Sequence, residues 1–493
     1  MPLLLGLDIG TTICKAVIFD EAGRPLASGS STGYPIYRQA DGSAEQAPAD
    51  WWRAAIEAVG TATKAIGDRA SEVAAIGMCG AWGQVFAKPN GEVVERSITW
   101  QDARAHDEAR WLAETVGTEA MRKMVTVALP LTATLPPARL LWLRRHRPEF
   151  LSGAWLMVQP KDYVTYRLTG SWATDPASCV TVLDLHARRI DPGFAKLFDL
   201  PPNLLPELRD PFEPAGHLLP DIARSLGLPA GIPVATGWVD SWASMFGTGL
   251  GVRGLGFDVA GTSETVGLTA DHVTGDHHGL LVMPLGDSRH TVYGLTVAGG
   301  DSLKWFVEAF VDEVASDAAF ATFEREAAIT MPGADGLLFL PYLFGERTPL
   351  WDERVRGQFF GIDRGHRRRH FSRAVIEGLA HCVRQIVTLG ETVAGAKIDT
   401  IRASGGAARS AAVNQIKADV LQKPVEITAV TEAGTLGAAM LAAIALGLAD
   451  GYADAVQRMV HVARRFEPDP ALADRYDADH KRYCALYPAI KGI

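Results

Sequence analysis

The chain opens with short runs of apolar residues separated by tight turns. Residues 3–9 form an apolar run with one charge, Asp8, and residues 14–19 form a second run. The turn Gly10-Thr11-Thr12 connects the two runs, and a third run over 25–28 follows a further turn. Short β-type runs bounded by Gly, Asp and Thr predict strands joined by turns.

Helical patterns begin after these strands. Residues 48–64 have helical spacing with Asp50 as the N-terminal cap, and residues 74–79 predict a short buried strand. Strands and helical segments alternate from there on, which is typical of an α/β architecture. The uncharged, Ala-rich stretch 434–449 is too short to span a bilayer comfortably and predicts a buried core helix.

A second copy of the opening pattern stands in the middle of the chain. Residues 255–263, Leu-Gly-Phe-Asp-Val-Ala-Gly-Thr-Ser, echo residues 5–12 with one residue inserted, and chance similarity of short Gly/Thr segments is the alternative. A chain of 493 residues is too long for one hydrophobic core. Because the Gly-rich stretch 247–251 precedes the second copy, we place the domains at 1–247 and 248–493.

Composition narrows the class of protein. The hydrophobic share is 47%, the charged share is 21% and the formal net charge is −9, which is typical of a soluble globular protein and argues against nucleic acid or an anionic membrane as a partner. The five cysteines are scattered without a Cys-x-x-Cys spacing, so a reducing compartment is expected. Met1-Pro2 leads straight into the apolar run without a signal-peptide pattern, and we expect a cytoplasmic protein.

The first turn has the chemistry of a phosphate site. Backbone N–H groups of a tight Gly-Thr-Thr turn can bind phosphate oxygens, and the two hydroxyls add donors. The carboxylate of Asp8 could hold a hydrated Mg²⁺, and Lys15 could add a positive charge nearby. A plain hairpin turn with a solvent-facing Asp is the alternative.

Several segments together resemble the FGGY family of carbohydrate kinases, whose fold is shared with actin, hexokinase and the heat-shock ATPase chaperones. The opening run and turn resemble the start of that family. Later segments resemble its other motifs in the same order: Trp100-Gln101-Asp102-Ala103-Arg104, Gly237-Trp238-Val239-Asp240-Ser241-Trp242-Ala243, Gly261-Thr262-Ser263, Gly299-Gly300 with Trp305, Gly345 to Gly357, and Ser404-Gly405-Gly406-Ala407. The resemblance implies an α/β fold of two actin-like (ribonuclease H-like) domains with mixed sheets flanked by helices and an active-site cleft between them.

The resemblance also implies roles for single residues. Asp240 would be the general base, because a sugar hydroxyl must lose its proton as it attacks the γ-phosphate of ATP. Asp8 would position Mg²⁺. The residues implied to bind ATP or its phosphates are Gly10, Thr11, Thr12, Lys15, Gly261, Thr262, Gly300, Gly405, Gly406, Ala407 and Asn414, although Asn414 could equally be solvated. The residues expected to contact sugar are Trp82, Gln84, Asp102, Arg104 and Asp240.

The identity of the sugar stays open. Residues 79–84 differ from the corresponding segments of both xylulose and glycerol kinases, and Ser241 stands where these carry Asn or Gln. Trp82 could offer a ring face to the C–H edge of a sugar while Gln84 bonds a hydroxyl, or Trp82 could pack at the domain interface. We therefore expect ATP-dependent phosphorylation of a primary hydroxyl of a small sugar. A pentulose such as xylulose is the default, and ribulose, erythritol and glycerol-like polyols remain open.

Two other classes of protein compete with a kinase. One is an ATP-binding switch of the actin or chaperone type that acts on protein partners, and the other is a sugar-binding sensor with weakened turnover. The Trp-x-Asp-x-Arg segment and the base at Asp240 count against the switch. The family resemblance favours a homodimer.

Overall fold

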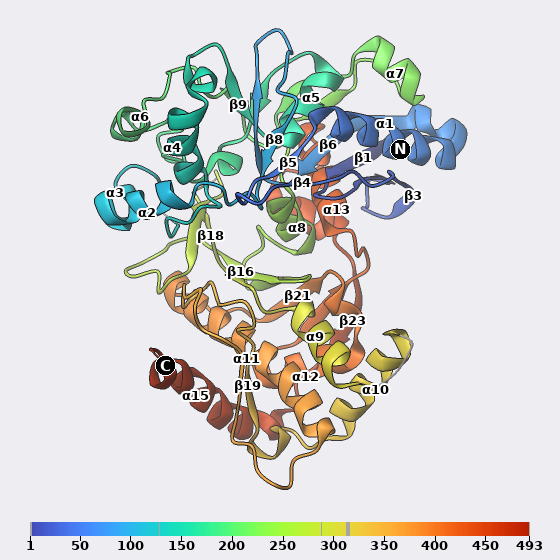
Figure 1. The fold of residues 1–493 in the computed structure, drawn as a ribbon. Coiled ribbons are helices and arrows are strands. Elements are labelled where there is room, and N and C mark those ends of the chain that lie inside the picture. Colours follow the sequence, from blue (N-terminus) through green and yellow to red (C-terminus); the bar gives the residue numbers. More distant parts are fainter. Residues whose placement is uncertain (1, 128, 287, 312–315, 493) are drawn as a thin grey trace. The chain divides into compact units, whose positions relative to one another are not determined.

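The structure, a computed structural model, describes residues 2–127, 129–286, 288–311 and 316–492. It divides into two compact units, which Figure 1 shows with the chain coloured from end to end. One unit comprises Met1–Gly247 and Ala433–Met459, and the other comprises Thr248–Glu432 and Val460–Ile493. The chain thus returns to the first unit near its end. The domain ranges expected from the sequence, 1–247 and 248–493, are continuous and do not contain this return.

The first unit is built on a seven-stranded sheet in the order β12-β13-β6-β1-β2-β3, with β14 also paired to β6. β1 is parallel to β6, and β6 is parallel to β13 and β14, whereas β2 is antiparallel to both of its neighbours, β1 and β3. The strands are β1 (Leu3–Ile9), β2 (Cys14–Phe19), β3 (Pro25–Ser30), β6 (Val73–Gly80), β12 (Pro214–His217), β13 (Pro233–Ala235) and β14 (Trp238–Val239). The first two strands match the sequence prediction, and the strand predicted at 74–79 extends by one residue at each end.

Helices pack on both faces of this sheet. The odd-numbered residues of β1 share a core with α1 (Pro48–Ile66) and α5 (Pro160–Thr169). The cap of α1 is Ala47, so the prediction of Asp50 as the cap was wrong; Asp50 lies in the first turn, where its charge favours the positive end of the helix.

The opposite face of the sheet is covered by α13 (Ala433–Ala445), which is seen in orange-red beside the blue strands in Figure 1. The approach requires glycine, because a Cβ at Gly77 would lie 1.8 Å from the carbonyl oxygen of Ala438 and one at Gly6 would lie 2.0 Å from that of Thr435. The predicted buried core helix in this Ala-rich stretch is confirmed.

A smaller five-stranded sheet, in the order β4-β5-β8-β7-β9, completes the first unit together with a helical layer. Its aromatic and aliphatic core includes residues from α4 and the segment that follows it. The strands are β4 (Tyr37–Arg38), β5 (Ala44–Gln46), β7 (Gly83–Ala87), β8 (Ser97–Thr99) and β9 (Leu156–Val158), and a separate parallel pair is formed by β10 (Ala173–Thr174) and β11 (Glu207–Leu208). The remaining helices of this unit are α2 (His106–Thr115), α3 (Thr118–Met121), α4 (Pro136–His146), α6 (Pro192–Phe198), α7 (Pro220–Leu226) and α14 (Tyr452–Met459), and α8 (Asp240–Thr248) leads out of it.

The second unit contains its own seven-stranded mixed sheet, in the order β17-β18-β16-β15-β21-β22-β23. The strands are β15 (Leu255–Ala260), β16 (Glu264–Ala270), β17 (Leu281–Pro284), β18 (His290–Thr296), β21 (Thr400–Ser404), β22 (Val425–Thr428) and β23 (Val462–Phe466). A two-stranded sheet is formed by β19 (Leu338–Leu340) and β20 (Gln358–Phe360). The helices are α9 (Gly300–Phe310), α10 (Ser316–Ile329), α11 (Arg368–Ala394), α12 (Ala411–Leu421) and α15 (Ala473–Ile490).

The two main sheets repeat one arrangement. In the first unit β3, β2 and β1 are antiparallel neighbours and β1 is parallel to β6; in the second unit β18, β16 and β15 are antiparallel neighbours and β15 is parallel to β21. The tight Gly-Thr turn joins the equivalent strands in both, β1 to β2 and β15 to β16. The shared strand order supports duplication of one domain over chance similarity of the two segments.

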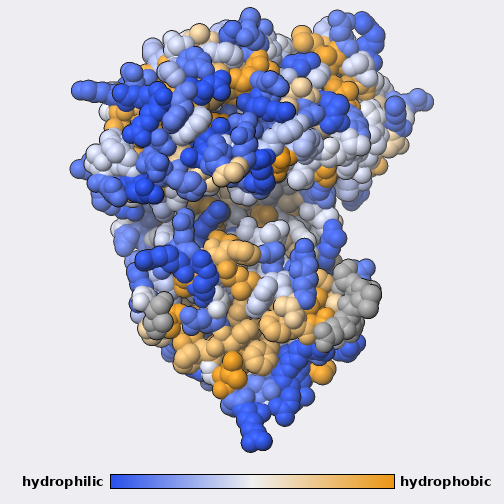
Figure 2. Space-filling view, in the orientation of Figure 1, coloured by the Kyte–Doolittle hydropathy of each residue, from blue (hydrophilic) through white to orange (hydrophobic). Residues whose placement is uncertain are grey.

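The surfaces of the two units differ in apolar character. Figure 2 shows mainly hydrophilic residues over much of the first unit and broad orange areas on the second. Large apolar side chains of the second unit that are strongly exposed include Ile329, Met331, Phe344 and Ile362. Among the described residues, none of the helices combines the length and apolar character needed to cross a bilayer.

Candidate functional site

Three parallel strands of the first unit end side by side. Asp8 on β1 pairs with Cys79 on β6, which pairs with Trp238 on β14, and the next residues along each strand are also in register. Carboxyl ends of parallel strands meet at one edge of a sheet, which is where α/β proteins bind ligands. The edge therefore gathers the turn after Asp8, the segment leading to Trp82, and Asp240 at the start of α8.

Asp8 and Asp240 both raise the pKa values of two neighbouring side chains, Cys79 and Tyr34. Burial raises the pKa of the Cys79 thiol well above its ordinary value, and the negative charges of Asp8 and Asp240 raise it further. The same two charges also raise the pKa of Tyr34, for which burial is again the largest cause. Asp8 and Asp240 thus lie close enough to share one electrostatic environment.

Asp240 has the character expected of a base. Burial raises the pKa of its carboxyl above the ordinary value, while the backbone N–H of Ser241, which donates to Asp240 Oδ1 at 2.6 Å, opposes the shift. A base whose pKa moves toward the working pH is better matched to taking a proton.

Asp8 lies on the face of β1 that α13 covers. Its Oδ2 is 3.5 Å from the position that a Cβ on Gly434 would occupy, and Gly434 stands in the first turn of α13. The positive end of the helix dipole favours the ionised carboxylate. Lys15 lies opposite Asp8 across the β1–β2 pair.

The turn Gly10-Thr11-Thr12, the predicted phosphate turn, is held by hydrogen bonds to its carbonyls. The Tyr34 hydroxyl donates to the Gly10 carbonyl, the Tyr34 N–H donates to the Thr12 carbonyl at 3.0 Å, and Gln46 Nε2 donates to the Thr11 carbonyl at 2.7 Å. In the described part of the chain, no acceptor is found for the backbone N–H groups of Gly10, Thr11 and Thr12. A turn with its carbonyls fixed and its N–H groups uncommitted is suited to binding an anion.

Trp82 and the segment 100–104 make different hydrogen bonds near the edge formed by the ends of β1, β6 and β14. Trp82 is partly buried and its Nε1 donates to the Ser178 carbonyl at 2.9 Å. Trp100, whose side chain the sequence left without a role, donates from Nε1 to Thr11 Oγ1 at 3.1 Å and so contacts the phosphate turn directly. Buried Arg139 holds this segment by donating to the carbonyls of Trp100 and Asp102, at 2.9 Å and 2.8 Å.

Three of the residues expected to contact sugar have partners within the protein. Asp102 is fully buried and accepts from the Ala44 N–H and from Arg104, and Arg104 also pairs with Glu45 at 2.6 Å. Gln84 is 2% exposed on β7, with its amide nitrogen 3.4 Å from the sulfur of Met157. Gln84 and Arg104 line a cavity whose walls include none of Asp8, Thr11, Thr12 and Asp240.

A buried ion cluster lies next to the strand ends, and the sequence patterns did not predict it. Lys161 Nζ pairs with Asp162 at 2.6 Å and Asp175 at 3.0 Å, and Gln159 Oε1 accepts from the Gly83 N–H at 3.1 Å. Burial opposes the charge on Lys161, but the two carboxylates raise its pKa above the ordinary value. The signal in the sequence was Gln159-Pro160-Lys161-Asp162, where proline and a reciprocal cap start α5.

The second unit gathers the remaining predicted residues. Gly261 and Gly405 follow the paired ends of β15 and β21, and the Gly300 N–H donates to the Gly261 carbonyl at 2.9 Å. Gly405 has φ +92°, and a Cβ there would lie 2.5 Å from the Ala260 carbonyl oxygen. Thr262 accepts through its carbonyl from the Asp301 N–H at 3.1 Å.

Asn414 is neither solvated nor free to turn. It is 2% exposed, and its Nδ2 donates to the Ala408 carbonyl at 2.7 Å. The side chain thereby holds the short turn Ala407–Arg409 that follows Gly406. Its burial excludes the solvated alternative and gives Asn414 a role in shaping this loop.

The second copy of the aspartate has a different partner. Asp258 is fully buried, and its Oδ2 pairs with Lys417 Nζ at 2.6 Å; Lys417 also lies 3.2 Å from Glu264. Burial opposes the charge on Lys417, yet these two carboxylates raise its pKa. Asp258 is therefore part of an internal ion cluster.

The donors present fit a magnesium ion held mainly by its substrate. The described residues contain no group of three or more His, Cys, Asp or Glu side chains that could cage a metal. Mg²⁺ in kinases is usually held by one or two carboxylates, by water and by phosphate oxygens. Asp8, beside a turn with uncommitted N–H groups, suits that kind of site.

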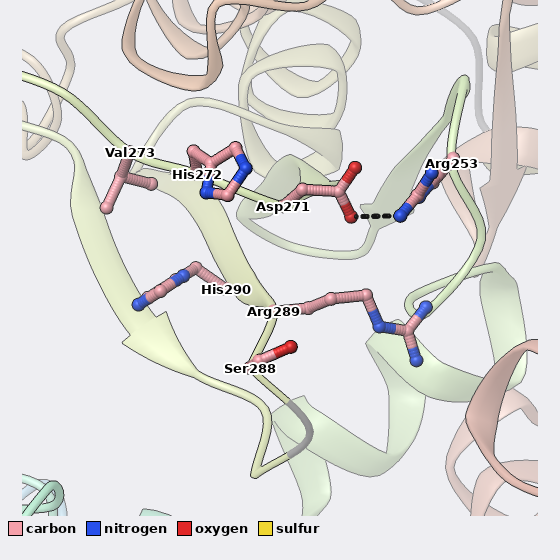
Figure 3. A pocket seen from close by; sticks show the side chains of 7 residues that line it. All are labelled: Arg253, Asp271, His272, Val273, Ser288, Arg289 and His290. Carbon is pink, nitrogen blue, oxygen red and sulfur yellow. Dashed lines mark ion pairs between the residues drawn. The ribbon is translucent and has the colours of Figure 1, made fainter.

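A hollow of about 790 Å³ in the second unit lies apart from these residues (Figure 3). It is found where β16 ends and β18 begins, whereas the Gly261–Ser263 turn lies at the other end of β16. Arg253 points toward Asp271 and pairs with it at 2.8 Å, and Arg289 donates to the Gly251 carbonyl at 2.5 Å. This hollow is not part of the candidate site.

Comparison with known proteins matches both parts of the chain to one family. Residues 3–247 match the model of the FGGY family of carbohydrate kinases, N-terminal domain, and residues 257–446 match its C-terminal domain. The chain is 30% identical to the xylulose kinase of Lactococcus lactis subsp. lactis (strain IL1403), covering 100% of this chain and 98% of that protein. It is also 30% identical to the gluconokinase of Bacillus subtilis (strain 168), over 96% of this chain and 93% of the relative. The crystal structure of xylulose kinase from Rhodospirillum rubrum superposes with a TM-score of 0.88 at 29% identity, covering 99% of each chain.

Proposed function

The chain belongs to the FGGY family of carbohydrate kinases, and from this premise we propose that it transfers the γ-phosphate of ATP to a primary hydroxyl of xylulose. The predicted family and the predicted α/β fold of two domains are confirmed by the comparisons. Xylulose is the first candidate because xylulose kinases are prominent among both the relatives and the solved structures.

One observation carries the proposal for the site. The parallel ends of β1, β6 and β14 bring Asp8, the approach to Trp82 and Asp240 to one sheet edge, next to a turn with uncommitted N–H groups. Phosphoryl transfer needs these parts: an anion cradle, a carboxylate for the metal and a base for the attacking hydroxyl.

Asp240 would take the proton of the sugar hydroxyl onto a carboxylate oxygen as that hydroxyl attacks. Its other oxygen, Oδ1, accepts from the Ser241 N–H, so the backbone fixes the orientation of the carboxylate. Bound Mg²⁺ would neutralise negative charge on the phosphates, and Asp8 is the residue that would hold the ion, directly or through water. Thr11 and Thr12 would add hydroxyl donors to the N–H groups of their turn.

The second unit supplies the residues proposed to hold the nucleotide. Gly405, Gly406 and Ala407 would let the backbone approach the adenosine. No protein atom lies within 4 Å of the place that a Cβ on Gly406 would occupy, so this side of the loop is open to a ligand. Gly261, Thr262 and Gly300 would bind phosphate oxygens. Asn414 would act indirectly, through the Ala408 carbonyl that it holds.

On the sugar side the geometry favours Trp82 over the other predicted contacts. Trp82 follows β6 to the edge where Asp8 and Asp240 lie, and its ring could cover the C–H face of the sugar. Asp102 would act as a positioning residue, a role supported by its burial and its bonds to Arg104 and Ala44. Gln84 and Arg104 face a separate cavity.

A substrate panel tests the proposal. The purified protein is given Mg-ATP with xylulose, ribulose, gluconate, erythritol and glycerol in a coupled ADP-release assay, and we expect the highest kcat/KM for xylulose. Sugar-independent ATP hydrolysis stimulated by peptides would contradict a kinase and favour an ATP-driven switch, and sugar binding without ADP release would favour a sensor.

Replacing the base tests the mechanism. In Asp240→Asn we expect a folded protein whose turnover falls by two or more orders of magnitude, on the order of 3 kcal/mol in transition-state stabilisation. The matched control is Asp221→Asn, because the Asp221 side chain is 89% exposed on α7 and should be silent. Near-normal turnover of Asp240→Asn would remove this residue from the chemistry.

A further inference from the structure

One buried ammonium group joins three separate segments of the first unit. Lys161, at the start of α5, is 0% exposed, and its Nζ pairs with Asp162 at 2.6 Å and with Asp175 at 3.0 Å. The same Nζ donates to the Thr236 carbonyl at 3.1 Å. Lys161, Asp162 and Asp175, the Lys161 cluster, therefore hold residues that are far apart in the sequence.

Asp175 connects this cluster to Trp82. Its carboxylate accepts from the Ser178 N–H at 3.0 Å and from the Ser178 hydroxyl, which fixes the short turn Pro176–Cys179. The Ser178 carbonyl in turn accepts from Trp82 Nε1 at 2.9 Å and from Gln159 Nε2 at 3.2 Å. The indole N–H of Trp82 is thus engaged within the protein, so a ligand meets the ring of Trp82 and not its donor.

Gln159 holds the residue that follows Trp82. Its Oε1 accepts from the Gly83 N–H at 3.1 Å, and its own backbone N–H donates to Asp162 Oδ2 at 2.8 Å. Gln159 is 3% exposed. The side chain of Trp82 and the backbone next to it are therefore both tied to the Lys161 cluster.

The ammonium group of Lys161 also fixes the strand that leads to Asp240. Thr236, whose carbonyl it binds, stands directly before Gly237 and β14, and Asp240 follows β14. Gly237 has φ +78°, and a Cβ there would lie 2.1 Å from the Met78 carbonyl oxygen. This stretch of backbone is thus packed tightly against β6 on one side and bonded to Lys161 on the other.

The charge of Lys161 acts at the same sheet edge as the two aspartates. Burial is the largest cause of the raised pKa of the Cys79 thiol, and the charges of Asp8 and Asp240 raise this pKa further. The charge of Lys161 lowers the same pKa. The ammonium group therefore lies near the edge where β1, β6 and β14 end.

Stability alone does not account for the Lys161 cluster. Burying one ammonium and two carboxylates costs desolvation free energy, which offsets their attraction, and well-packed apolar side chains are often as stabilising. The hydrogen bonds of the cluster lead to two segments, one that carries Trp82 and one that carries Asp240.

We propose that Lys161 and Asp175 are positioning residues for the sugar site, which hold the Trp82 ring and the backbone before Asp240 in one fixed relation. The inference rests on the proposed function, in which Trp82 covers the sugar and Asp240 takes its proton. It adds that Trp82 faces the sugar in a set orientation and donates no hydrogen bond to it.

Asp175→Asn tests the link to Trp82. Lys161 stays paired with Asp162 in this variant, whereas Lys161→Met would leave two carboxylates buried without a cation. One oxygen that accepts from Ser178 is replaced by a donor, so the turn that anchors Trp82 should shift. We expect the KM for xylulose, or for the best acceptor of the substrate panel, to rise about tenfold, with the KM for ATP unchanged.

A purely structural role predicts a different kinetic result. Loss of folded enzyme would lower kcat and leave both KM values unchanged, and that outcome in Asp175→Asn would overturn the proposal. Asp221→Asn, at an exposed position on α7, is the matched control and should keep both KM values.

A measurement without turnover separates this inference from the proposed function. The chain is labelled with 5-fluorotryptophan, and the ¹⁹F signal of Trp82 is identified by its loss in Trp82→Phe. We expect this signal to shift in Asp175→Asn and to stay in place in Asp221→Asn. If no sugar is phosphorylated, the proposed function fails, and the ¹⁹F signal still decides whether Asp175 positions Trp82. An unshifted signal in folded Asp175→Asn would overturn the proposal.

Ser178→Ala is the second variant. It removes the hydroxyl that donates to Asp175 and leaves every charge of the Lys161 cluster in place. We expect the Trp82 signal to shift in the same direction as in Asp175→Asn, by a smaller amount. Thermal unfolding shows which variants are folded. If Asp175→Asn does not fold, an unshifted Trp82 signal in Ser178→Ala would refute the proposed link.

Discussion

The two Gly-Thr turns have the same strand frame, but the aspartate before each turn has different surroundings. In each unit an antiparallel pair is closed by the turn and flanked by a parallel strand. In the first, Asp8 is partly exposed beside the start of α13; in the second, Asp258 is fully buried against Lys417. The comparison teaches that a repeated backbone can place equivalent aspartates in different surroundings, one at a partly exposed sheet edge and one in the interior.

The difference follows from the element that faces each aspartate. α13 presents Gly434 and the positive end of its dipole to Asp8, which stabilises the carboxylate. α12 presents Lys417 to Asp258, and the ammonium pairs with Asp258 Oδ2 inside the second unit. Local sequence at the two turns is nearly identical, so the distinction is set by helices far along the chain.

The largest expected effect comes from removing Lys417. Lys417→Met leaves Asp258 and Glu264 buried without their cation, and we expect a loss of about 3–5 kcal/mol in the free energy of unfolding. Urea denaturation measures it. Lys397→Met is the control, because that side chain is 78% exposed and its ion pair should contribute less than about 1 kcal/mol. Equal losses in the two variants would contradict an interior role for the cluster.

Replacing each aspartate by asparagine in turn tests whether Asp8 acts in turnover and Asp258 in stability. Asp8→Asn should lower turnover by two or more orders of magnitude, about 3 kcal/mol, and should destabilise the protein less than Asp258→Asn does. Asp258→Asn should destabilise the second unit by leaving Lys417 with Glu264 alone. Coupled ADP release and urea denaturation are measured on both variants, and a reversed pattern would mean that the aspartates were assigned the wrong way round.

The adjacent glycines Gly405 and Gly406 sharpen the comparison within the loop that we propose binds the nucleotide. Gly405→Ala forces a Cβ to within 2.5 Å of the Ala260 carbonyl at positive φ, and we expect about 1–3 kcal/mol lower stability. A Cβ on Gly406 meets nothing within 4 Å, so Gly406→Ala should keep its stability and raise only the KM for ATP. An unchanged KM in Gly406→Ala would show that the nucleotide does not approach this backbone.

The smallest effect expected is a pH dependence of kcat/KM, which would arise from Asp240 in the first unit. Burial raises the pKa of Asp240, and a base must be ionised to act, so kcat/KM should be retained above that pKa and fall as the pH drops through it. The acid limb should have its midpoint above the ordinary range of an aspartate. A profile that stays flat into that ordinary range would contradict the assignment of Asp240 as the base.

Local patterns in the sequence predicted the strands and the turn, but not the partners of the side chains. The apolar runs at 3–9 and 14–19 became β1 and β2, because alternation and turn residues act over a few positions. The placement of Gln84 and Arg104 could not be read this way, since it depends on Met157 and Glu45, which distant segments bring to the sheet. Sequence spacing says which residues share a strand face and leaves open what packs against that face.

The return of α13 to the first unit also governs when that unit can fold during synthesis. Gly6 and Gly77 are shaped to receive a helix that the ribosome makes roughly 200 residues after Gly247, a delay on the order of 10–40 s at common elongation rates. Until then the β1–β6 surface lacks its cover. A nascent chain ending at residue 247 would therefore expose this surface, and the second unit must be made before the first can close its core.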